Sequence, residues 1–346
     1  MTLPLAGDRT LYEPGTLGAA TLRSRRRSPQ SLVIGRLHRG VKRQLPLALL
    51  VAFLITAAGM AYDISGGLSA LTAALFWAPL GVATGIGVGL VRELGRNTVT
   101  SLSSFGKRRG YPVLGAAPEL TERTLLQLPP DRRTPLGCIV FQPASPFATS
   151  FRDLQSVIGE HGVVAFIAAL PNEGATTATL CAGASAAMQG RRTIIVDCDI
   201  RRRSLTRELG ADPTEGVIQA CNAPSEWRRF VEEEEESGVH YLAAARMQTP
   251  WRSLVGAEGL LQLIAGLRQH YDLVLLDCPP AIGSEGSMIA GLADRTVLVT
   301  AWDRTPLNAV RAAMRTLTHR ARKGGVAGVY VNRVPQGYRF GRLRGD

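Results

Sequence analysis

Cysteine is scarce in this chain, and its pattern excludes two kinds of stabilising site. The 346 residues contain five cysteines and five histidines, with no C-x-x-C pair and no histidine at metal-ligand spacing. A structural zinc site and a disulfide framework are therefore both excluded. We interpret the cysteines as small buried residues of a protein in a reducing cytosol, because free cysteine commonly packs as a hydrophobic residue.

Charge is absent from two long stretches near the N-terminus. No charged residue lies between Gln44 and Tyr62, and after the single Asp63 none lies between Ile64 and Val91. Each run exceeds the ~18 apolar residues that cross a bilayer as a helix. The sequence therefore predicts a transmembrane hairpin over 44–91, with spans at about 45–62 and 68–91. A signal peptide is the alternative for the first run, but a long basic tail precedes it and no cleavage site is evident.

Positive charge flanks both runs and is concentrated before the first. The net charge is +12, and residues 1–43 form a tail with eight basic side chains in its second half. Arg92 and Arg96 follow the second run, so both flanks are predicted to be cytoplasmic. The arginines lack interleaved aromatic residues and adjoin a membrane span. We therefore expect the membrane and its anionic lipids, and no nucleic acid, as the partner of the tail.

Small residues repeat along the second predicted span. Gly81, Gly85 and Gly89 recur every four residues, which allows another helix to approach closely. The partner is either the first span of the same hairpin or the same helix of another copy in a homo-oligomer. The sequence leaves both alternatives open.

The remainder of the chain is predicted to be a linker, an α/β domain and a short tail. Residues 92–144 are rich in turn-forming proline and glycine and are interpreted as a cytoplasmic linker. Residues 145–335 alternate apolar runs of strand length with helical patterns, and 336–346 form a basic C-terminal tail. Alternation of this kind predicts a parallel sheet with helices on both faces. The glutamate run Glu232–Glu236 is interpreted as a solvated helix or loop face without a function.

A glycine-containing loop follows the first strong strand pattern of the α/β domain. Phosphate-binding loops of the form G-x-x-x-x-G-K-[ST] direct backbone N–H groups and a lysine at phosphates, and a hydroxyl at Mg²⁺. Here Gly174 and Thr176 occupy the second glycine and hydroxyl positions, but Ala175 stands where the lysine belongs. Two later strand patterns end in Asp197 and Asp199, and in Asp277. Carboxylates at such strand ends can hold Mg²⁺ or position an attacking hydroxyl.

Together these segments resemble the cytoplasmic domain of bacterial tyrosine kinases that are joined to polysaccharide co-polymerases. The family loop typically has the sequence P-G-E-G-K-S-T, and the matching residues are Pro171, Asn172, Glu173, Gly174, Ala175, Thr176 and Thr177. The family's Asp-x-Asp-x-Arg motif matches Asp197, Asp199 and Arg201, and its third aspartate matches Asp277. Asn332 falls where related ATPases present a residue to adenine. The resemblance covers roughly residues 83–334.

The resemblance implies a P-loop NTPase-like fold with ATP and Mg²⁺ as cofactors. The loop residues 171–177, Arg201 and Asn332 would bind the nucleotide, Asp197 and Asp199 would act in catalysis, and Thr176, Asp197 and Asp277 would hold the metal ion. It also implies polysaccharide polymerase or export proteins as partners. The location implied is the bacterial inner membrane, with both termini cytoplasmic.

Three departures from the family change the expected activity. Ala175 removes a cation from the phosphates, which predicts weak or lost nucleotide binding and impaired phosphoryl transfer. The C-terminal tail has a single tyrosine, Tyr338, where the family has several, and the extracytoplasmic domain is reduced to a turn. The first hypothesis is therefore a kinase-like accessory protein of exopolysaccharide assembly. The alternatives are an active tyrosine autokinase and a membrane-recruited positioning ATPase.

Overall fold

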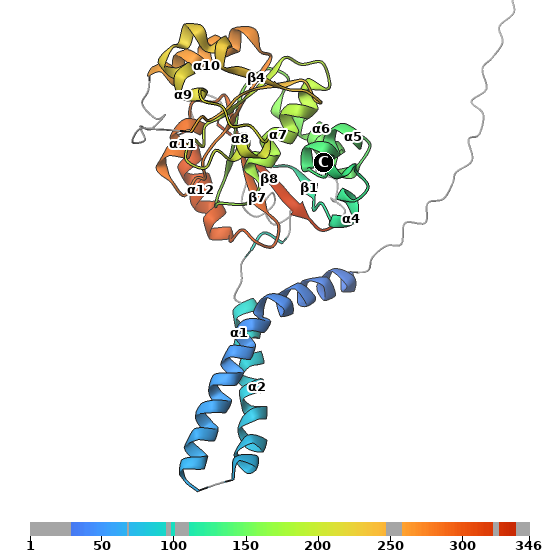
Figure 1. Cartoon of the computed structure of the whole chain (residues 1–346), viewed down its shortest axis with the longest axis vertical. Coiled ribbons are helices and arrows are strands. Elements are labelled where there is room, and N and C mark those ends of the chain that lie inside the picture. Colours follow the sequence, from blue (N-terminus) through green and yellow to red (C-terminus); the bar gives the residue numbers. More distant parts are fainter. Residues whose placement is uncertain are drawn as a thin grey trace, which may run out of the picture. The chain divides into compact units, whose positions relative to one another are not determined.

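A computed structural model describes residues 29–67, 69–94, 98–100, 111–246, 258–320 and 325–336. The chain divides into two compact units, residues 1–94 and 95–346, which are drawn in Figure 1. The basic residues of the tail before position 29, the basic cluster at 107–109 and Tyr338 lie outside the described residues.

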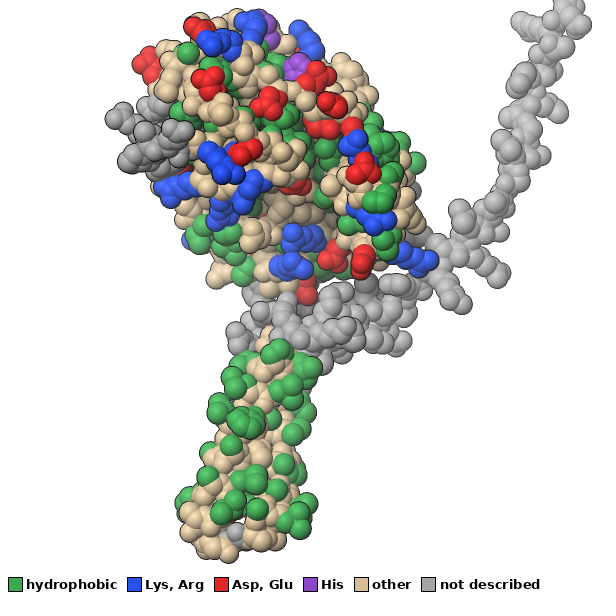
Figure 2. Space-filling model, in the orientation of Figure 1, with side chains coloured by type: hydrophobic (Ala, Val, Ile, Leu, Met, Phe, Trp, Pro, Cys, Tyr) green, Lys and Arg blue, Asp and Glu red, His purple; other side chains and the backbone are tan. Residues whose placement is uncertain are grey.

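The first unit is a helical hairpin. Helix α1 runs from Pro29 to Ser65 and helix α2 from Ala70 to Leu94. Segments Gln44–Ser65 and Ala70–Gly89 are long and apolar enough to cross a membrane, and only 6% and 17% of an apolar 18-residue stretch in each is buried. Figure 2 shows apolar side chains covering the outside of this hairpin. An apolar exterior of this kind suits a lipid environment and is unfavourable in water.

The glycine repeat of α2 is used inside the hairpin. A Cβ atom placed on Gly85 would lie 2.3 Å from the carbonyl oxygen of Ala48, and one on Gly81 would lie 2.6 Å from that of Ala52. Nearer the turn, Gly59 of α1 leaves room for the ring of Trp77, whose Nε1 donates to Asp63 Oδ2 at 2.7 Å. Of the two alternatives for the small residues, packing within the hairpin is therefore the one observed at Gly81 and Gly85.

The second unit is built on an eight-stranded sheet in the order β1-β8-β7-β2-β6-β3-β5-β4. All neighbouring strands are parallel except β4 and β5, which are antiparallel. The strands are β1 (Val113–Pro118), β2 (Gly162–Ala168), β3 (Thr193–Asp197), β4 (Val231–Glu234), β5 (Val239–Leu242), β6 (Leu273–Asp277), β7 (Arg295–Ala301) and β8 (Val326–Val334). We call the side of the sheet where the parallel strands end the carboxyl edge, and the side where they begin the amino edge.

Helices connect the strands and cover both faces of the sheet (Figure 1). They are α4 (Glu122–Leu125), η1 (Pro130–Arg132), α5 (Pro135–Phe141), α6 (Pro146–Ile158), α7 (Ala175–Ala187), α8 (Ser204–Glu208), α9 (Val217–Asn222), η2 (Pro224–Phe230), α10 (Glu258–His270), α11 (Ser284–Ala290) and α12 (Leu307–Arg320). Helix α6 shows why the chain folds this way locally. The Ser145 hydroxyl accepts from the Ala148 amide at 3.1 Å, and Pro146 occupies the first turn, where its missing N–H costs nothing.

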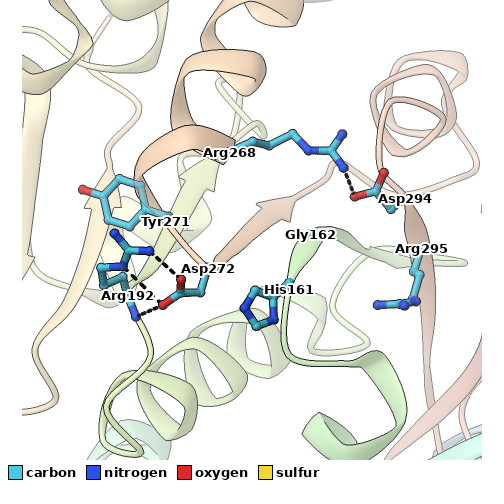
Figure 3. A pocket seen from close by; sticks show the side chains of 8 residues that line it. All are labelled: His161, Gly162, Arg192, Arg268, Tyr271, Asp272, Asp294 and Arg295. Atoms are coloured by element: carbon cyan, nitrogen blue, oxygen red, sulfur yellow. Dashed lines mark hydrogen bonds and ion pairs between the residues drawn. The ribbon is translucent and has the colours of Figure 1, made fainter.

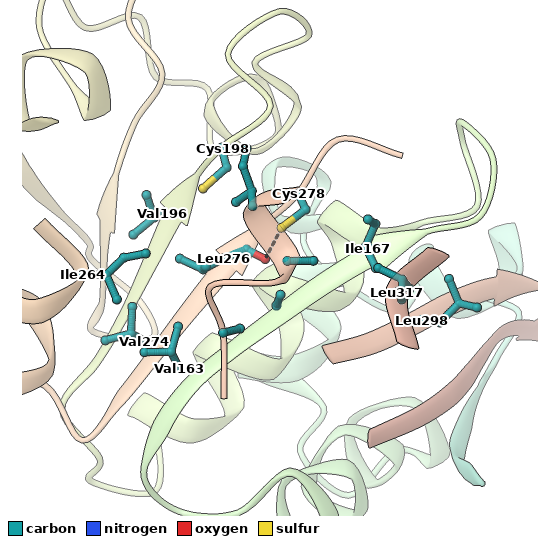
Figure 4. Close-up of a cluster of buried hydrophobic side chains, with 14 of the residues drawn as sticks. Val163, Ile167, Val196, Cys198, Ile264, Val274, Leu276, Cys278, Leu298 and Leu317 are labelled. Atoms are coloured by element: carbon teal, nitrogen blue, oxygen red, sulfur yellow. Dashed lines mark hydrogen bonds between the residues drawn. The ribbon is translucent and has the colours of Figure 1, made fainter. Parts of the chain in front are cut away.

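Two apolar cores lie on opposite faces of the sheet. In β2, Val163 and Ile167 belong to one core and Val164 and Phe166 to the other, and all four are fully buried. Figure 4 shows part of the first core, where Val163 and Ile167 lie with Val274 and Leu276 of β6. Burial on both faces explains why the strand sequences are continuous apolar runs. The predicted α/β class, with a parallel-dominated sheet preceded by two apolar helices, is confirmed.

The segment interpreted as a linker differs from expectation. Residues 113–118 form β1, which pairs in parallel with β8 at one end of the sheet, and Ala117 is fully buried. Helices α4, η1 and α5 follow before residue 145. The linker interpretation was wrong for these residues because the turn-forming glycines and prolines stand between short elements that pack on the domain, and do not separate domains.

The glutamate run also differs from expectation, because it forms β4 and the turn after it. As an edge strand it pairs with β5 alone, and Glu232 Oε2 accepts from the Tyr241 hydroxyl at 2.7 Å. Glu236 forms an ion pair with Arg132. Charged side chains on an edge strand discourage pairing with further strands, which gives the run a structural role.

Candidate functional site

The loop between β2 and α7 lies at the carboxyl edge of the sheet. β2 ends at Ala168 and α7 begins at Ala175, so residues 169–174 form the turn. Asn172 and Gly174 both have positive φ, 64° and 94°. This conformation directs the start of α7, with its free N–H groups and positive helix-dipole end, into the turn. The local backbone is therefore suited to an anion such as a phosphate.

Glu173 holds the loop in place through two buried hydrogen bonds. Its side chain is only 4% exposed, and Oε2 accepts from the Leu170 amide at 2.9 Å. The other oxygen accepts from the Thr305 hydroxyl, which belongs to the turn between β7 and α12. Burial raises the Glu173 pKa, and the bonds from Thr305 and Leu170 oppose that shift. The glutamate of the loop motif is thus a structural brace.

Asn332, near the end of β8, also holds the loop in place through a hydrogen bond to its backbone. Its Nδ2 donates to the carbonyl oxygen of Glu173 at 3.1 Å, and its Oδ1 accepts from the Arg333 amide at 2.8 Å. A Cβ atom on Gly174 would lie 2.1 Å from Nδ2, so a glycine is required where the asparagine approaches. Asn332 therefore acts as a second brace, and its amide keeps one N–H and one oxygen lone pair for the predicted contact with adenine.

The aspartates that end β3 and β6 lie side by side behind the loop. The two strands pair in parallel with Asp197 opposite Asp277. Asp197 is fully buried, and its Oδ2 accepts from the amide and hydroxyl of Thr206 at 3.0 and 2.7 Å. Asp277 Oδ1 lies 3.4 Å from the Thr179 hydroxyl. Its Oδ2 is buried and has no hydrogen-bond partner among the described residues, which leaves one oxygen available to a ligand.

Burial and mutual repulsion disfavour the charged forms of these aspartates. Burial is the main cause that raises the Asp197 pKa to about 6. Burial, and then the charge of Asp197, raise the Asp277 pKa well above its usual value. Burial also raises the Asp199 pKa, which the neighbouring Arg202 opposes. A cation at this position would relieve the repulsion. The loop does not supply one, because Ala175 stands where a lysine is expected.

A cavity of about 230 Å³ opens in front of the loop. Residues 172–177 and Asp199 of the predicted set line it. Asp197, Asp277 and Asn332 stand behind this lining and support it through the contacts described above. Pro171 and Arg201 are exposed away from it, and Arg201 lies 4.0 Å from Glu285 of α11. The structure therefore assembles most of the predicted residues around one cavity.

Three charged residues outside the predicted set also line the cavity: Arg202, Glu208 and Arg333. Arg333 has φ 59°, and burial and the nearby Arg304 lower its pKa. Glu208 lies at the rim, where its Oε2 accepts from the Thr177 hydroxyl at 3.3 Å. Arg333 directly follows Asn332, and that adjacency is the only signal in the sequence that could have pointed to it. Glu208 follows the Asp-x-Asp motif in a short helix and carries no such signal.

The site provides part of a magnesium-binding set. Among the described residues, no three His, Cys, Asp or Glu side chains converge on one point as a protein metal site would require. The free oxygen of Asp277 and the hydroxyl of Thr176, in the first turn of α7, are the available metal ligands. Mg²⁺ commonly binds one or two protein oxygens together with waters and substrate phosphates. The donors therefore fit magnesium that arrives with a nucleotide.

Comparison with known proteins identifies relatives of this domain. No protein-family model matches the chain. The succinoglycan biosynthesis transport protein ExoP of Rhizobium meliloti is 28% identical over 185 residues, which are 50% of this chain and 23% of ExoP. EpsB of Ralstonia nicotianae is 24% identical over 272 residues, which are 76% of this chain and 36% of EpsB. The chain thus spans about a quarter to a third of the length of these relatives.

A solved structure supports the same relationship at the level of the fold. The kinase domain of the Escherichia coli tyrosine kinase ETK superposes with a TM-score of 0.60 at 18% identity, over 69% of this chain and 97% of that domain. The fold, the loop at the carboxyl edge and the sequence similarity agree. The chain is similar in sequence to the succinoglycan biosynthesis transport protein ExoP and to the putative tyrosine-protein kinase EpsB, and it shares the fold of the ETK kinase domain.

Proposed function

We propose that this chain is a membrane-anchored, kinase-like accessory protein of exopolysaccharide biosynthesis or export that binds nucleotide weakly and is impaired in phosphoryl transfer. The observation that supports this proposal is Ala175 at the start of α7, in a loop whose backbone and braces are otherwise complete. A charge-assisted contact of the kind a lysine makes is worth about 1.5–3 kcal/mol. Its loss weakens binding of a triphosphate more than it disturbs the loop.

The residues that remain in the loop and at the strand ends would bind the phosphates and the magnesium ion. The N–H groups at the start of α7 would receive the phosphates, and Thr176 with the free oxygen of Asp277 would hold a magnesium ion that neutralises phosphate charge. Asp197 positions this region through Thr206 and the Asp199 amide. Asp199 and Arg202 face the cavity, where they would meet the terminal phosphate.

The two apolar helices would anchor this domain in the bacterial inner membrane with both termini in the cytoplasm. Their length and composition and the basic flanks support this topology. The turn between them leaves no room for a folded extracytoplasmic domain, since only residues 66–69 separate the helices. We therefore place the protein's contacts with polymerase or export proteins, and any homo-oligomer, on its cytoplasmic unit or its helices.

Restoring the lysine tests the proposal. Titration of the full chain in nanodiscs with ATP and Mg²⁺ by calorimetry should show weak binding, and Ala175→Lys should raise the affinity about 10- to 150-fold. Ala175→Gln is the matched control, because it adds a long polar side chain without charge. An equal gain for both variants, or none for either, would contradict the proposal.

The second candidate is an active tyrosine autokinase. It is favoured by Arg202 and Arg333, two cations that line the loop cavity and could compensate for Ala175. The two functions are separated by incubating the full chain with ATP and Mg²⁺ and probing for phosphotyrosine. Robust phosphorylation that Asp197→Ala abolishes would establish the autokinase, whereas none above the variant's background would support the accessory role.

A further inference from the structure

Helix α12 carries a row of basic side chains on the side opposite its buried face. Arg311, Arg315 and His319 follow one another at intervals of four residues, which places them on one side of the helix. The opposite side, with Val310, Met314 and Leu317, is buried against the domain. Arg304 just before the helix and Arg320 at its end add two more exposed cations, and no Asp or Glu occurs from 304 to 320. We call Arg304, Arg311, Arg315, His319 and Arg320 the α12 stripe.

The arginines of the α12 stripe differ from most other arginines of the domain in their surroundings. Arg192, Arg203 and Arg268 each form an ion pair with an aspartate. Among the described residues, no carboxylate lies within ion-pair distance of Arg304, Arg311, Arg315 or Arg320. Arg304 lies close enough to Arg333, which has the same sign, to lower the pKa of that arginine. This concentration of uncompensated charge is complementary to an anionic surface.

The start of α12 is tied to the end of the membrane hairpin by a short length of chain. Thr98 forms a β-bridge with Pro306, and the buried Val99 exchanges backbone hydrogen bonds with Thr305 and Asp303 at 3.0 and 2.7 Å. Thr98 is the fourth residue after Leu94, where α2 ends. Four residues span at most about 14 Å even when fully extended. Only this length of chain separates the end of α2 from the residues that bond to the start of α12.

We propose that the α12 stripe docks on the anionic lipid headgroups of the membrane that the hairpin enters. The candidate span in α2 ends at Gly89, so the tether begins where a bilayer interface would lie. Basic side chains held near such an interface are attracted by the negative surface potential of anionic lipids, and this attraction falls off within a Debye length of about 8–10 Å. Charge and tether length together favour lipid over a soluble acidic protein. The proposal does not depend on nucleotide binding.

A fluorescent probe on the stripe can test this contact in the full chain. Ala312 is exposed between Arg311 and Arg315, and all five native cysteines are buried, so Ala312→Cys provides a selective labelling site. The labelled protein is placed in nanodiscs of phosphatidylcholine alone or with phosphatidylglycerol, each with a headgroup-quencher lipid. We expect stronger quenching with phosphatidylglycerol and a loss of the difference at high salt.

Charge removal gives the decisive comparison. Arg311→Gln with Arg315→Gln should reduce the ratio of docked to undocked protein about fivefold per arginine. Arg123→Gln with Arg229→Gln is the matched control, because it removes two exposed arginines from α4 and η2 and should leave quenching unchanged. Equal quenching in both lipid mixtures would overturn the proposal and would point to an acidic protein as the partner of the stripe. Equal losses in both double variants would overturn it too, because the effect would then follow net charge.

Discussion

The two edges of the sheet handle charge in opposite ways. At the amino edge, a hollow of about 870 Å³ is lined by two aspartates, each of which is paired with an arginine (Figure 3). Arg192 binds Asp272 through two nitrogens, and Arg268 binds Asp294, which also accepts from the Val163 amide at 2.8 Å. Hydrogen bonds from Arg192 lower the Asp272 pKa.

At the carboxyl edge the cavity is smaller, about 230 Å³, and among the described residues no ion pair joins Asp197 or Asp277 behind it to a cation. Burial raises the pKa of Asp197, Asp199 and Asp277, and no lysine follows Gly174. Size alone would favour the amino-edge hollow over the loop cavity. Charge that the protein leaves uncompensated is the better indicator of a ligand site, because a group selected for stability alone would be paired.

The largest effect is expected from Asp277→Asn, which removes the least compensated carboxylate. Without the anionic oxygen, affinity for ATP with Mg²⁺ should fall about 10- to 150-fold in calorimetry. In the absence of magnesium, the same change should raise the unfolding midpoint, because it removes repulsion with Asp197. If the variant bound the magnesium nucleotide as tightly as the parent chain, uncompensated charge at the carboxyl edge would not mark a ligand site.

The raised Asp197 pKa at the carboxyl edge should make the protein less stable as the pH rises. The Asp197 pKa is raised from 3.8 to about 6 in the folded protein, so its contribution is favourable at low pH and is lost as the pH rises through 6. A pKa raised from 3.8 to about 6 is worth about 3 kcal/mol between pH values below 3.8 and above 6, and about 1.4 kcal/mol of this is lost between pH 5 and pH 8. Magnesium-free protein should therefore melt at a lower temperature at pH 8 than at pH 5, and Asp197→Asn should reduce this difference. Stability that increased steadily over this range would argue against the assignment.

A smaller effect is expected from Glu208→Gln at the rim of the loop cavity. The change removes a negative charge near the phosphates but keeps an oxygen that can accept from Thr177. Repulsion between one carboxylate and a nearby phosphate across solvent weakens binding by about 1 kcal/mol. Removing that charge should therefore raise nucleotide affinity about fivefold. Calorimetry on the parent and the variant measures the change, and a loss of affinity would show that Glu208 helps to bind the ligand.

The smallest effect is expected at the amino edge. Asp272→Asn breaks the contact with Arg192, whose side chain is 67% exposed, so the cost to stability should be less than about 1 kcal/mol. Because the Asp272 pKa is lowered, its contribution is present above pH 4 and is lost as the pH falls below that. Nucleotide affinity should not change. A large change in affinity would show that the two edges are coupled.

Much of the fold could be predicted because its signals are local. The strand patterns that contain Val163–Ile167 and Leu273–Asp277 are apolar throughout, as burial on both faces of a sheet requires. The two uncharged runs predicted the hairpin for the same reason, since length and composition decide whether a helix suits a membrane. β1 was missed because a short edge strand with turn residues on both sides has little periodicity of its own.

The sequence by itself determined the parallel α/β architecture, the apolar hairpin and the loss of the lysine at Ala175, because each depends on the identity or the periodicity of neighbouring residues. Only the tertiary structure decided that Asn332 and Thr305 brace the loop, that Arg333 and Glu208 face it and that Gly85 packs within the hairpin. These contacts join segments up to 159 residues apart. Side chains so far apart in the chain meet only when the strands are ordered in the sheet, and strand order is not encoded in any local pattern.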